Sequence, residues 1–223
     1  MKIRIKFRKY GTMKFIGHLD VMRYFQKAIR RADVDVCYSG GFSPHQIMSF
    51  AAPLGVGNTS NGEYVDIEVS STKDSETMKK CLNGVMSEGF EVVSYRGLPD
   101  DAANAMSIVG AGDYTLAFRP GYEPEDMDKE TWFQGLIAFF ERPSVMVTKK
   151  TKRGDKEMDL KPLVYELRIC PEGDGEMEGP RLFMKISAGS AANVKPEQVL
   201  DAYYGFLGKE RPPFAFMVQR EEV

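Results

Sequence analysis

The first nine residues alternate between charged and apolar side chains. Apolar residues occupy every second position, at Ile3, Ile5 and Phe7, and lysines or arginines fill the positions around them. A period of two places successive side chains on opposite faces of a β-strand. The pattern therefore predicts a half-buried strand, and the fold must contain a sheet with one apolar and one charged face.

A βαββαβ order is predicted for the first part of the chain. A helix is expected at about 19–32, after Gly17 as its N-cap, because apolar residues recur there at helical spacing: Leu19, Met22, Phe25, Ala28 and Ile29. Extended segments are predicted at 36–39, 46–51, 64–69 and 90–95, and a second helix at 75–88 that Gly89 ends. This is the split βαβ pattern of ferredoxin-like folds.

The remainder of the chain repeats this order after a linker at 99–105. Strands are expected at 114–118, 164–169, 182–186 and 214–218, and helices at 129–141, with Trp132 in the core, and at 196–207. A charged hairpin is expected to join an additional strand at 145–148 to the strand at 164–169. We predict an α+β fold of two tandem ferredoxin-like (βαββαβ) lobes, residues 1–98 and 106–223, the first of which carries the motifs described below.

Three widely spaced cysteines, Cys37, Cys81 and Cys170, give neither a disulfide framework nor metal-ligand spacing. We therefore expect no metal site and no cofactor. The alternating N-terminus cannot form the apolar core of a signal peptide, and no apolar run is long enough to span a membrane. These features predict a cytoplasmic protein without a membrane partner.

Charge is segregated along the chain although the net charge is only −2. Residues 1–31 contain ten lysines or arginines and one acid, Asp20, whereas residues 99–131 contain eight acids against Arg119 and Lys129. Such segregation suits a protein that presents a basic surface to an anionic partner. The alternative is that the two segments neutralise each other in the fold.

Three motifs in the first 70 residues carry a family resemblance. They read G-H-L-D-x-x-R-(x)6-R-R at 17–31, Y-S-G-G-F-S-P-H at 38–45 and A-P-L-G-V-G at 52–57, and Glu63 follows them. In this combination the chain resembles the radical-SAM-linked family of bacterial proteins, with Gly17 and Gln46 where that family has Ser and Pro.

The resemblance implies a radical SAM enzyme as partner, fused to such a protein or encoded beside it, often near ribosomal and RNA-processing genes. It implies no established activity. The chain has no C-x-x-x-C-x-x-C run to ligate an iron–sulfur cluster, so any radical chemistry would belong to the partner.

Basic residues form a stripe on the polar side of the first predicted helix: Arg23, Lys27, Arg30 and Arg31. Arginines on a helix suit phosphate contacts, which dominate nucleic-acid affinity. The alternative is a solvated helix face. The cations of the first strand are instead expected to pair with Asp66 and its neighbours on the adjacent strand.

Two further segments are candidates for phosphate binding. The loop Ser39–His45 contains Gly40 and Gly41, so its backbone can approach a phosphate closely, although it could equally be a simple turn. A hairpin supplies an outer basic contact at Lys149, Lys150, Lys152 and Arg153, which nearby acids dilute.

His18 and His45 are the only histidines, and both lie in the family motifs. Together with Asp20 they are the candidate catalytic residues, as an acid–base pair or as ligands. The alternative is that each histidine only fixes local backbone. CRISPR repeat-processing ribonucleases also use tandem ferredoxin-like lobes with a histidine near the first helix, and His18 has a comparable place.

These features predict an RNA-binding accessory protein, rather than an enzyme, that presents ribosomal or transfer RNA to a radical SAM modifying enzyme; DNA is not expected as a partner. Two alternatives remain. One is a metal-independent endoribonuclease that uses His18, and the other is a docking module for the radical SAM partner without RNA contact.

Overall fold

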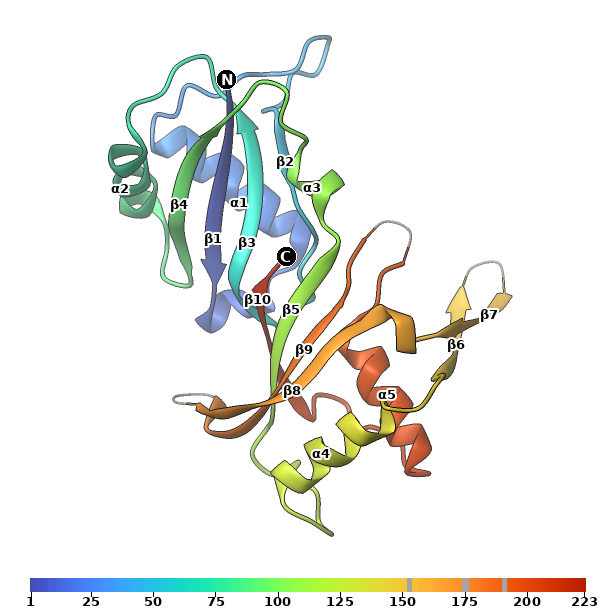
Figure 1. Cartoon of the computed structure of the whole chain (residues 1–223). Coiled ribbons are helices and arrows are strands. Elements are labelled where there is room, and N and C mark those ends of the chain that lie inside the picture. The colour runs from blue at the N-terminus through green and yellow to red at the C-terminus, as the bar shows by residue number, and fades with distance from the viewer. Residues whose placement is uncertain (152–153, 174–176, 190–191) are drawn as a thin grey trace. The chain divides into compact units, whose positions relative to one another are not determined.

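The computed structural model describes residues 1–151, 154–173, 177–189 and 192–223, and the side chains of 149–151, 156 and 171–172 also lie outside the described part. The chain is a mixed α+β protein of two compact units (Figure 1). The first unit comprises Met1–Val109 and Arg220–Val223, and the second comprises Gly110–Gln219. The last four residues therefore belong to the first unit.

The first unit is built around strand β1 (Lys2–Lys9). Antiparallel neighbours flank β1 on both sides, β3 (Thr59–Glu68) on one and β4 (Phe90–Leu98) on the other, and the short β2 (Met48–Phe50) pairs with β3. The helices of this unit are α1 (His18–Arg31), α2 (Ser75–Val85) and the short α3 (Ala105–Ile108). A 3-10 turn at Gly11–Phe15 leads into α1, which lies across one face of the sheet (Figure 1).

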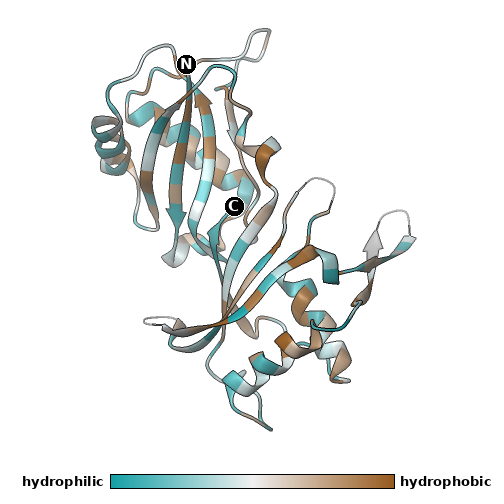
Figure 2. Cartoon of the chain, viewed as in Figure 1, coloured by the Kyte–Doolittle hydropathy of each residue, from teal (hydrophilic) through white to brown (hydrophobic). Residues whose placement is uncertain are grey.

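The structure confirms that β1 has one buried and one charged face, as its alternating sequence predicts. Ile3, Ile5 and Phe7 are buried against α1, and hydrophobic and hydrophilic residues alternate along the strands of this unit (Figure 2). The alternation extends by one unexpected residue, because Lys9 shares the buried face.

Helix α1 begins after Gly17, as predicted, and buries Val21, Phe25, Ala28 and Ile29. The prediction that Leu19 faces the core is wrong, because 66% of Leu19 is exposed. Leu19 lies two residues, or about 200° of helical rotation, from buried Val21 and so points away from the sheet.

The strands of the second unit follow the order β10-β5-β9-β8, which is one part of an eight-stranded sheet. These strands are β5 (Ala111–Phe118), β8 (Val164–Gly173), β9 (Gly179–Ser187) and β10 (Phe216–Glu222), of which the last continues into the first unit. Helices α4 (Lys129–Phe139) and α5 (Pro196–Phe206) complete the unit. Its core surrounds Trp132, whose burial confirms the prediction.

Two predicted connections differ in the structure. Helix α2 ends at Val85 rather than at residue 88, and Gly89, at φ +98°, shapes the turn before β4 instead of ending the helix. The segment at 145–148 is not joined by its hairpin to the strand at 164–169. Strand β6 (Met146–Thr151) pairs with β7 (Gly154–Asp159) in a separate two-stranded sheet, and a 3-10 turn at Lys161–Leu163 precedes β8.

Within the part of the chain that the structure describes, no helix combines the length and apolar character needed to cross a bilayer.

Candidate functional site

Four exposed cations line the solvent side of α1 and are called the basic face: Arg23, Lys27, Arg30 and Arg31. Arg23 forms an ion pair of 3.4 Å with Asp20, and both side chains are mostly exposed. The other three cations have no carboxylate partner among the described residues. The basic face therefore keeps most of its positive charge in solvent.

The cations of β1 behave differently. Arg4 forms two hydrogen bonds of 2.8 and 2.9 Å with Asp66, as the predicted cross-strand pairing requires. Arg8 pairs with Glu91 at 3.1 Å, and Lys6 pairs with Glu222 at 2.5 Å. Three cations on the charged face of β1 are thus paired with carboxylates, whereas three of the four cations on α1 are not paired among the described residues.

The segment Ser39–His45, called the glycine loop, is closed at its base by its two end residues. The Ser39 N–H donates to the His45 carbonyl at 2.8 Å, and the His45 N–H donates to Ser39 Oγ at 3.1 Å. The His45 ring also contacts Ser39 Oγ through Nδ1 at 2.9 Å. At the tip Gly41 has φ +96° and Phe42 is fully exposed. In the described structure the N–H groups of Gly40 and Gly41 have no acceptor.

Gln46 fixes the end of the glycine loop to α1. Its side chain is buried, and its amide donates to the main-chain carbonyl of Gln26 at 3.2 Å. The end of the loop is therefore held beside the middle of the helix that carries the basic face. Gln26 is eight residues from His18, which corresponds to about 12 Å along the helix axis. No hydrogen bond joins His18 to His45 or to Asp20 within the described residues.

His18 instead lies at the edge of a buried polar cluster formed by Lys9, Glu63 and Arg220. Arg220 and Glu63 are almost fully buried and form a bidentate ion pair, in which Arg220 Nε donates to Glu63 Oε1 at 2.7 Å. Arg220 also donates to the Ala52 carbonyl at 3.0 Å. This ion pair ties the end of β10 to β3 and to the third family motif.

Lys9 is the unbalanced charge of the cluster. It is 2% exposed, and its ammonium donates to the Ile16 carbonyl at 2.9 Å. Burial lowers the pKa of Lys9; the nearby carboxylate of Glu63 opposes this shift and Arg220 adds to it. The cluster therefore holds two basic side chains and a single carboxylate in the interior of the first unit.

The same surroundings favour the neutral form of the His18 ring. Burial lowers the pKa of His18 from its ordinary value of 6.5; Glu63 opposes the shift, and Arg220 and Lys9 reinforce it. The ring packs edge-on against Phe50, with 5.4 Å between ring centroids. The cavity that it lines with Lys9 and Glu63 has a volume of about 10 Å³. That volume holds about one water molecule and no substrate group.

The structure describes only part of the predicted basic hairpin. Lys149 and Lys150 belong to β6, but their side chains lie outside the described part, as do Lys152 and Arg153 altogether. Among the residues that the structure describes, no three His, Cys, Asp or Glu side chains are close enough together to hold a metal ion.

Sequence reasoning missed the buried polar cluster. A signal for Lys9 existed, because the alternation of β1 places residue 9 on the face of Ile3, Ile5 and Phe7. No local pattern connects Glu63 with Arg220, which are 157 residues apart.

A protein-family model, DUF2344, described as an uncharacterized protein conserved in bacteria, matches residues 2–196. The chain belongs to this family. The segment matched to DUF2344 includes α1, the glycine loop, Lys9 and Glu63, whereas Arg220 lies beyond it. No curated protein matches the sequence.

Proposed function

We propose that this DUF2344 protein is an RNA-binding accessory protein that acts in the cytoplasm and presents ribosomal or transfer RNA to a radical SAM modifying enzyme. The observation that carries the proposal is the contrast between α1 and β1. The three cations that β1 presents at Arg4, Lys6 and Arg8 have carboxylate partners. Lys27, Arg30 and Arg31 on α1 have none among the described residues.

The spacing of the basic face suits a nucleic-acid backbone. From Arg23 to Arg31 the helix advances about 12 Å, and one strand of a duplex presents a phosphate every 3.4 Å or so of axial rise. The face can therefore span about four successive phosphates. Three of its four cations are arginines, whose planar guanidinium groups bind phosphate oxygens in a bidentate manner.

The glycine loop adds two kinds of contact beside this face. Its free N–H groups at Gly40 and Gly41 can donate to a phosphate oxygen. Phe42 at the tip presents an exposed ring on which an unpaired base can stack. Because Gln46 ties the loop to α1, both contacts are available to a strand that lies along the helix.

We extend the proposal to the fold and to the partner. The strand orders, β4-β1-β3 with β2 beside β3, and β10-β5-β9-β8, support two ferredoxin-like units, the second with the β6–β7 hairpin inserted. The radical SAM enzyme enters through the resemblance of the motifs at 17–31, 38–45 and 52–57.

Cleavage of RNA by His18 has less support from the geometry. A general acid or base must reach the proton that it transfers, and His18 lines a cavity of about 10 Å³ without a second catalytic group at hydrogen-bond distance.

RNA binding across a salt series tests the proposal. Purified wild type is compared with the double variant Arg23→Glu/Arg30→Glu, using total cellular RNA and then a defined tRNA. The matched control is Lys73→Glu/Lys80→Glu, which makes the same charge change at exposed lysines outside α1. Loss of two phosphate contacts should reduce the slope of log K against log salt by about 1–2 and weaken binding strongly.

Equal RNA affinity in all three proteins would refute the basic face as the interface. Wild-type protein that binds no RNA at low salt, yet binds a radical SAM enzyme after nuclease treatment, would favour the docking alternative.

A further inference from the structure

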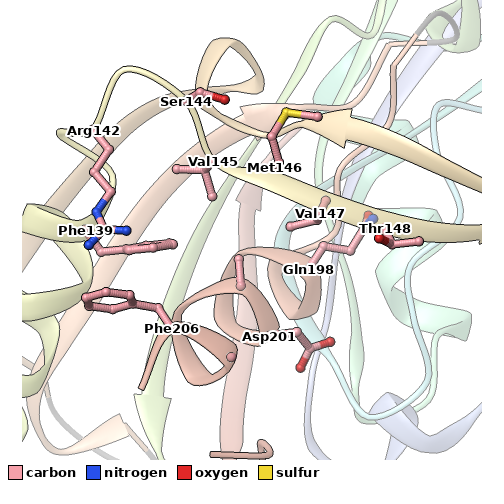
Figure 3. Close-up of a pocket in the computed structure, with 12 residues that line it drawn as sticks. Phe139, Arg142, Ser144, Val145, Met146, Val147, Thr148, Gln198, Asp201 and Phe206 are labelled. Atoms are coloured by element: carbon pink, nitrogen blue, oxygen red, sulfur yellow. The ribbon is translucent and has the colours of Figure 1, made fainter. Parts of the chain in front are cut away.

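The second unit contains a groove that the proposed function leaves unused (Figure 3). Its volume is about 520 Å³, and it runs between β6 on one side and α5 on the other. Met146, Val147 and Thr148 form the β6 side, and Gln198, Asp201 and Gly205 form the α5 side. Phe139, Phe206 and Arg142 close one end.

Strand β6 has a free edge at this groove. The N–H of Leu160 donates to the carbonyl of Val145 at 2.9 Å. Because hydrogen-bonded and non-hydrogen-bonded pairs alternate along an antiparallel ladder, Val145, Val147 and every second residue after them form their hydrogen bonds on the side of the neighbouring strand β7. The N–H and C=O groups of Met146 and Thr148 then point away from β7. Since β6 pairs only with β7 among the described strands, these groups form an open strand edge.

The walls of the groove are suited to apolar side chains. Met146 is 57% exposed and Phe206 is 50% exposed, although both are large and hydrophobic. Val147 packs on the main core of the unit. Exposed apolar groups beside an unpaired strand edge are typical of sites that receive an extended peptide, whose backbone pairs with the edge while alternate side chains enter the groove.

Arg142 supplies the charge at the end of the groove. Its guanidinium carbon lies 4.1 Å from the centroid of the Phe206 ring and 5.1 Å from that of Phe139. No carboxylate pairs with Arg142 in the described structure, whereas the nearby Asp201 already pairs with Arg211 at 2.6 Å. The groove therefore ends in an arginine that is held in place by stacking and lacks an anion.

We propose that this groove binds an extended acidic segment of a partner protein, which adds as a strand to the free edge of β6 and places a carboxylate on Arg142. The main-chain groups of Met146 and Thr148 align the segment, and Arg142 selects its charge. A peptide fits better than RNA, because the guanidinium covers the Phe206 ring on which a base would stack, while the free strand edge matches a peptide backbone.

Gly205 offers a clean way to fill the groove. A Cβ atom at Gly205 would have no heavy atom within 4 Å, so Gly205→Leu should fold normally and occupy the space that the peptide needs. Gly84 in α2 is likewise open, and Gly84→Leu is the matched control outside the groove. Thr148→Pro removes one free N–H of the edge, and Arg142→Gln removes the charge.

The probe is a phage library of random decapeptides, panned on the full-length protein and counter-selected on Gly205→Leu. Selected peptides are synthesised with a fluorescent label and measured by anisotropy. We expect β-branched residues that alternate around one Asp or Glu. Binding of the peptide should weaken at least tenfold in Gly205→Leu, Thr148→Pro and Arg142→Gln. It should remain unchanged in Gly84→Leu and in Arg23→Glu/Arg30→Glu. The proposed peptide site and the proposed RNA site can therefore be refuted independently of each other.

Exchange of the acidic residue of the peptide for its amide should weaken binding to wild type but not to Arg142→Gln. Failure to select any peptide that distinguishes wild type from Gly205→Leu would overturn the proposal, as would full binding by correctly folded Thr148→Pro. A single-stranded oligonucleotide whose binding is lost in Gly205→Leu would assign the groove to RNA and also overturn it.

Discussion

Substitution of Glu63 by glutamine should destabilise the first unit more than substitution of its ion-pair partner Arg220 by methionine. Glu63→Gln removes the only carboxylate of the buried polar cluster and leaves Lys9 and Arg220 as two buried cations. Arg220→Met leaves Glu63 with Lys9, which lines the same small cavity and carries the opposite charge. The two variants thus differ in the charge that remains buried.

The expected magnitudes follow from the burial of the pair. A buried ion pair that loses one partner costs about 3–5 kcal/mol when the remaining charge is uncompensated, and Glu63→Gln should fall in that range. Arg220→Met loses charge-assisted hydrogen bonds but keeps a neutral cluster, so we expect about 2 kcal/mol. At a urea dependence of about 2 kcal/mol per molar, the two unfolding midpoints should lie roughly 1 M apart.

Equilibrium urea unfolding followed by far-UV circular dichroism measures the difference. The only tryptophan, Trp132, lies in the second unit, so its fluorescence reports that unit separately. The control is Glu91→Gln, the same chemical change at a half-exposed residue that pairs with Arg8, and it should have little effect. If Arg220→Met is as destabilising as Glu63→Gln, or more so, Lys9 does not compensate Glu63 and the reasoning fails.

Two further predictions concern the same unit. Burial lowers the pKa of Lys9 below its ordinary value of 10.5. Just below pH 10.5 the Lys9 amine is therefore protonated more often in the unfolded chain than in the folded chain. The contribution of Lys9 to the free energy of unfolding consequently rises with pH toward 10.5. Urea unfolding at pH 8 and pH 10 should show a smaller gain for Lys9→Met than for wild type, and equal gains would contradict the shift. Gly89→Ala should cost about 2–4 kcal/mol, because its Cβ would lie 2.5 Å from Met13 Cγ at a residue with φ +98°. Thermal unfolding against Gly97→Ala, where the added Cβ meets open space, tests this; similar melting temperatures would contradict it.

Local periodicity predicted the elements that have one buried face. The alternation at 2–9 corresponds to β1, and the helical spacing after Gly17 corresponds to α1, with Phe25, Ala28 and Ile29 buried as expected. Periodicity failed at the first turn of α1, where Leu19 is three residues before Met22 but points away from the sheet. A hydrophobic pattern predicts that a helix has a buried face, but residues at the margin of the pattern can lie on either side of it.

The candidate site was predictable only where it depends on neighbours in sequence. Helical spacing alone predicts that Arg23, Lys27 and Arg30 share a face, and the structure gives them a common exposed surface. The ion pair of Arg220 with Glu63 depends on the return of the chain to the first unit, which no local signal announces. The groove beside β6 was missed for a related reason, since the sequence predicts a hairpin that connects the strands at 145–148 and 164–169, whereas β6 pairs with β7 in a sheet of its own.

The return of residues 220–223 to the first unit has a consequence for synthesis of the chain on the ribosome. Residues 1–109 are made first, and the whole second unit must then be translated before Arg220 exists. At about 5–20 residues per second this interval lasts roughly 5–20 s. During that time Glu63 has no arginine, and only Lys9 can neutralise it. The second unit is continuous in sequence. The nascent chain can therefore complete the second unit before the first unit, although synthesis of the first unit began earlier.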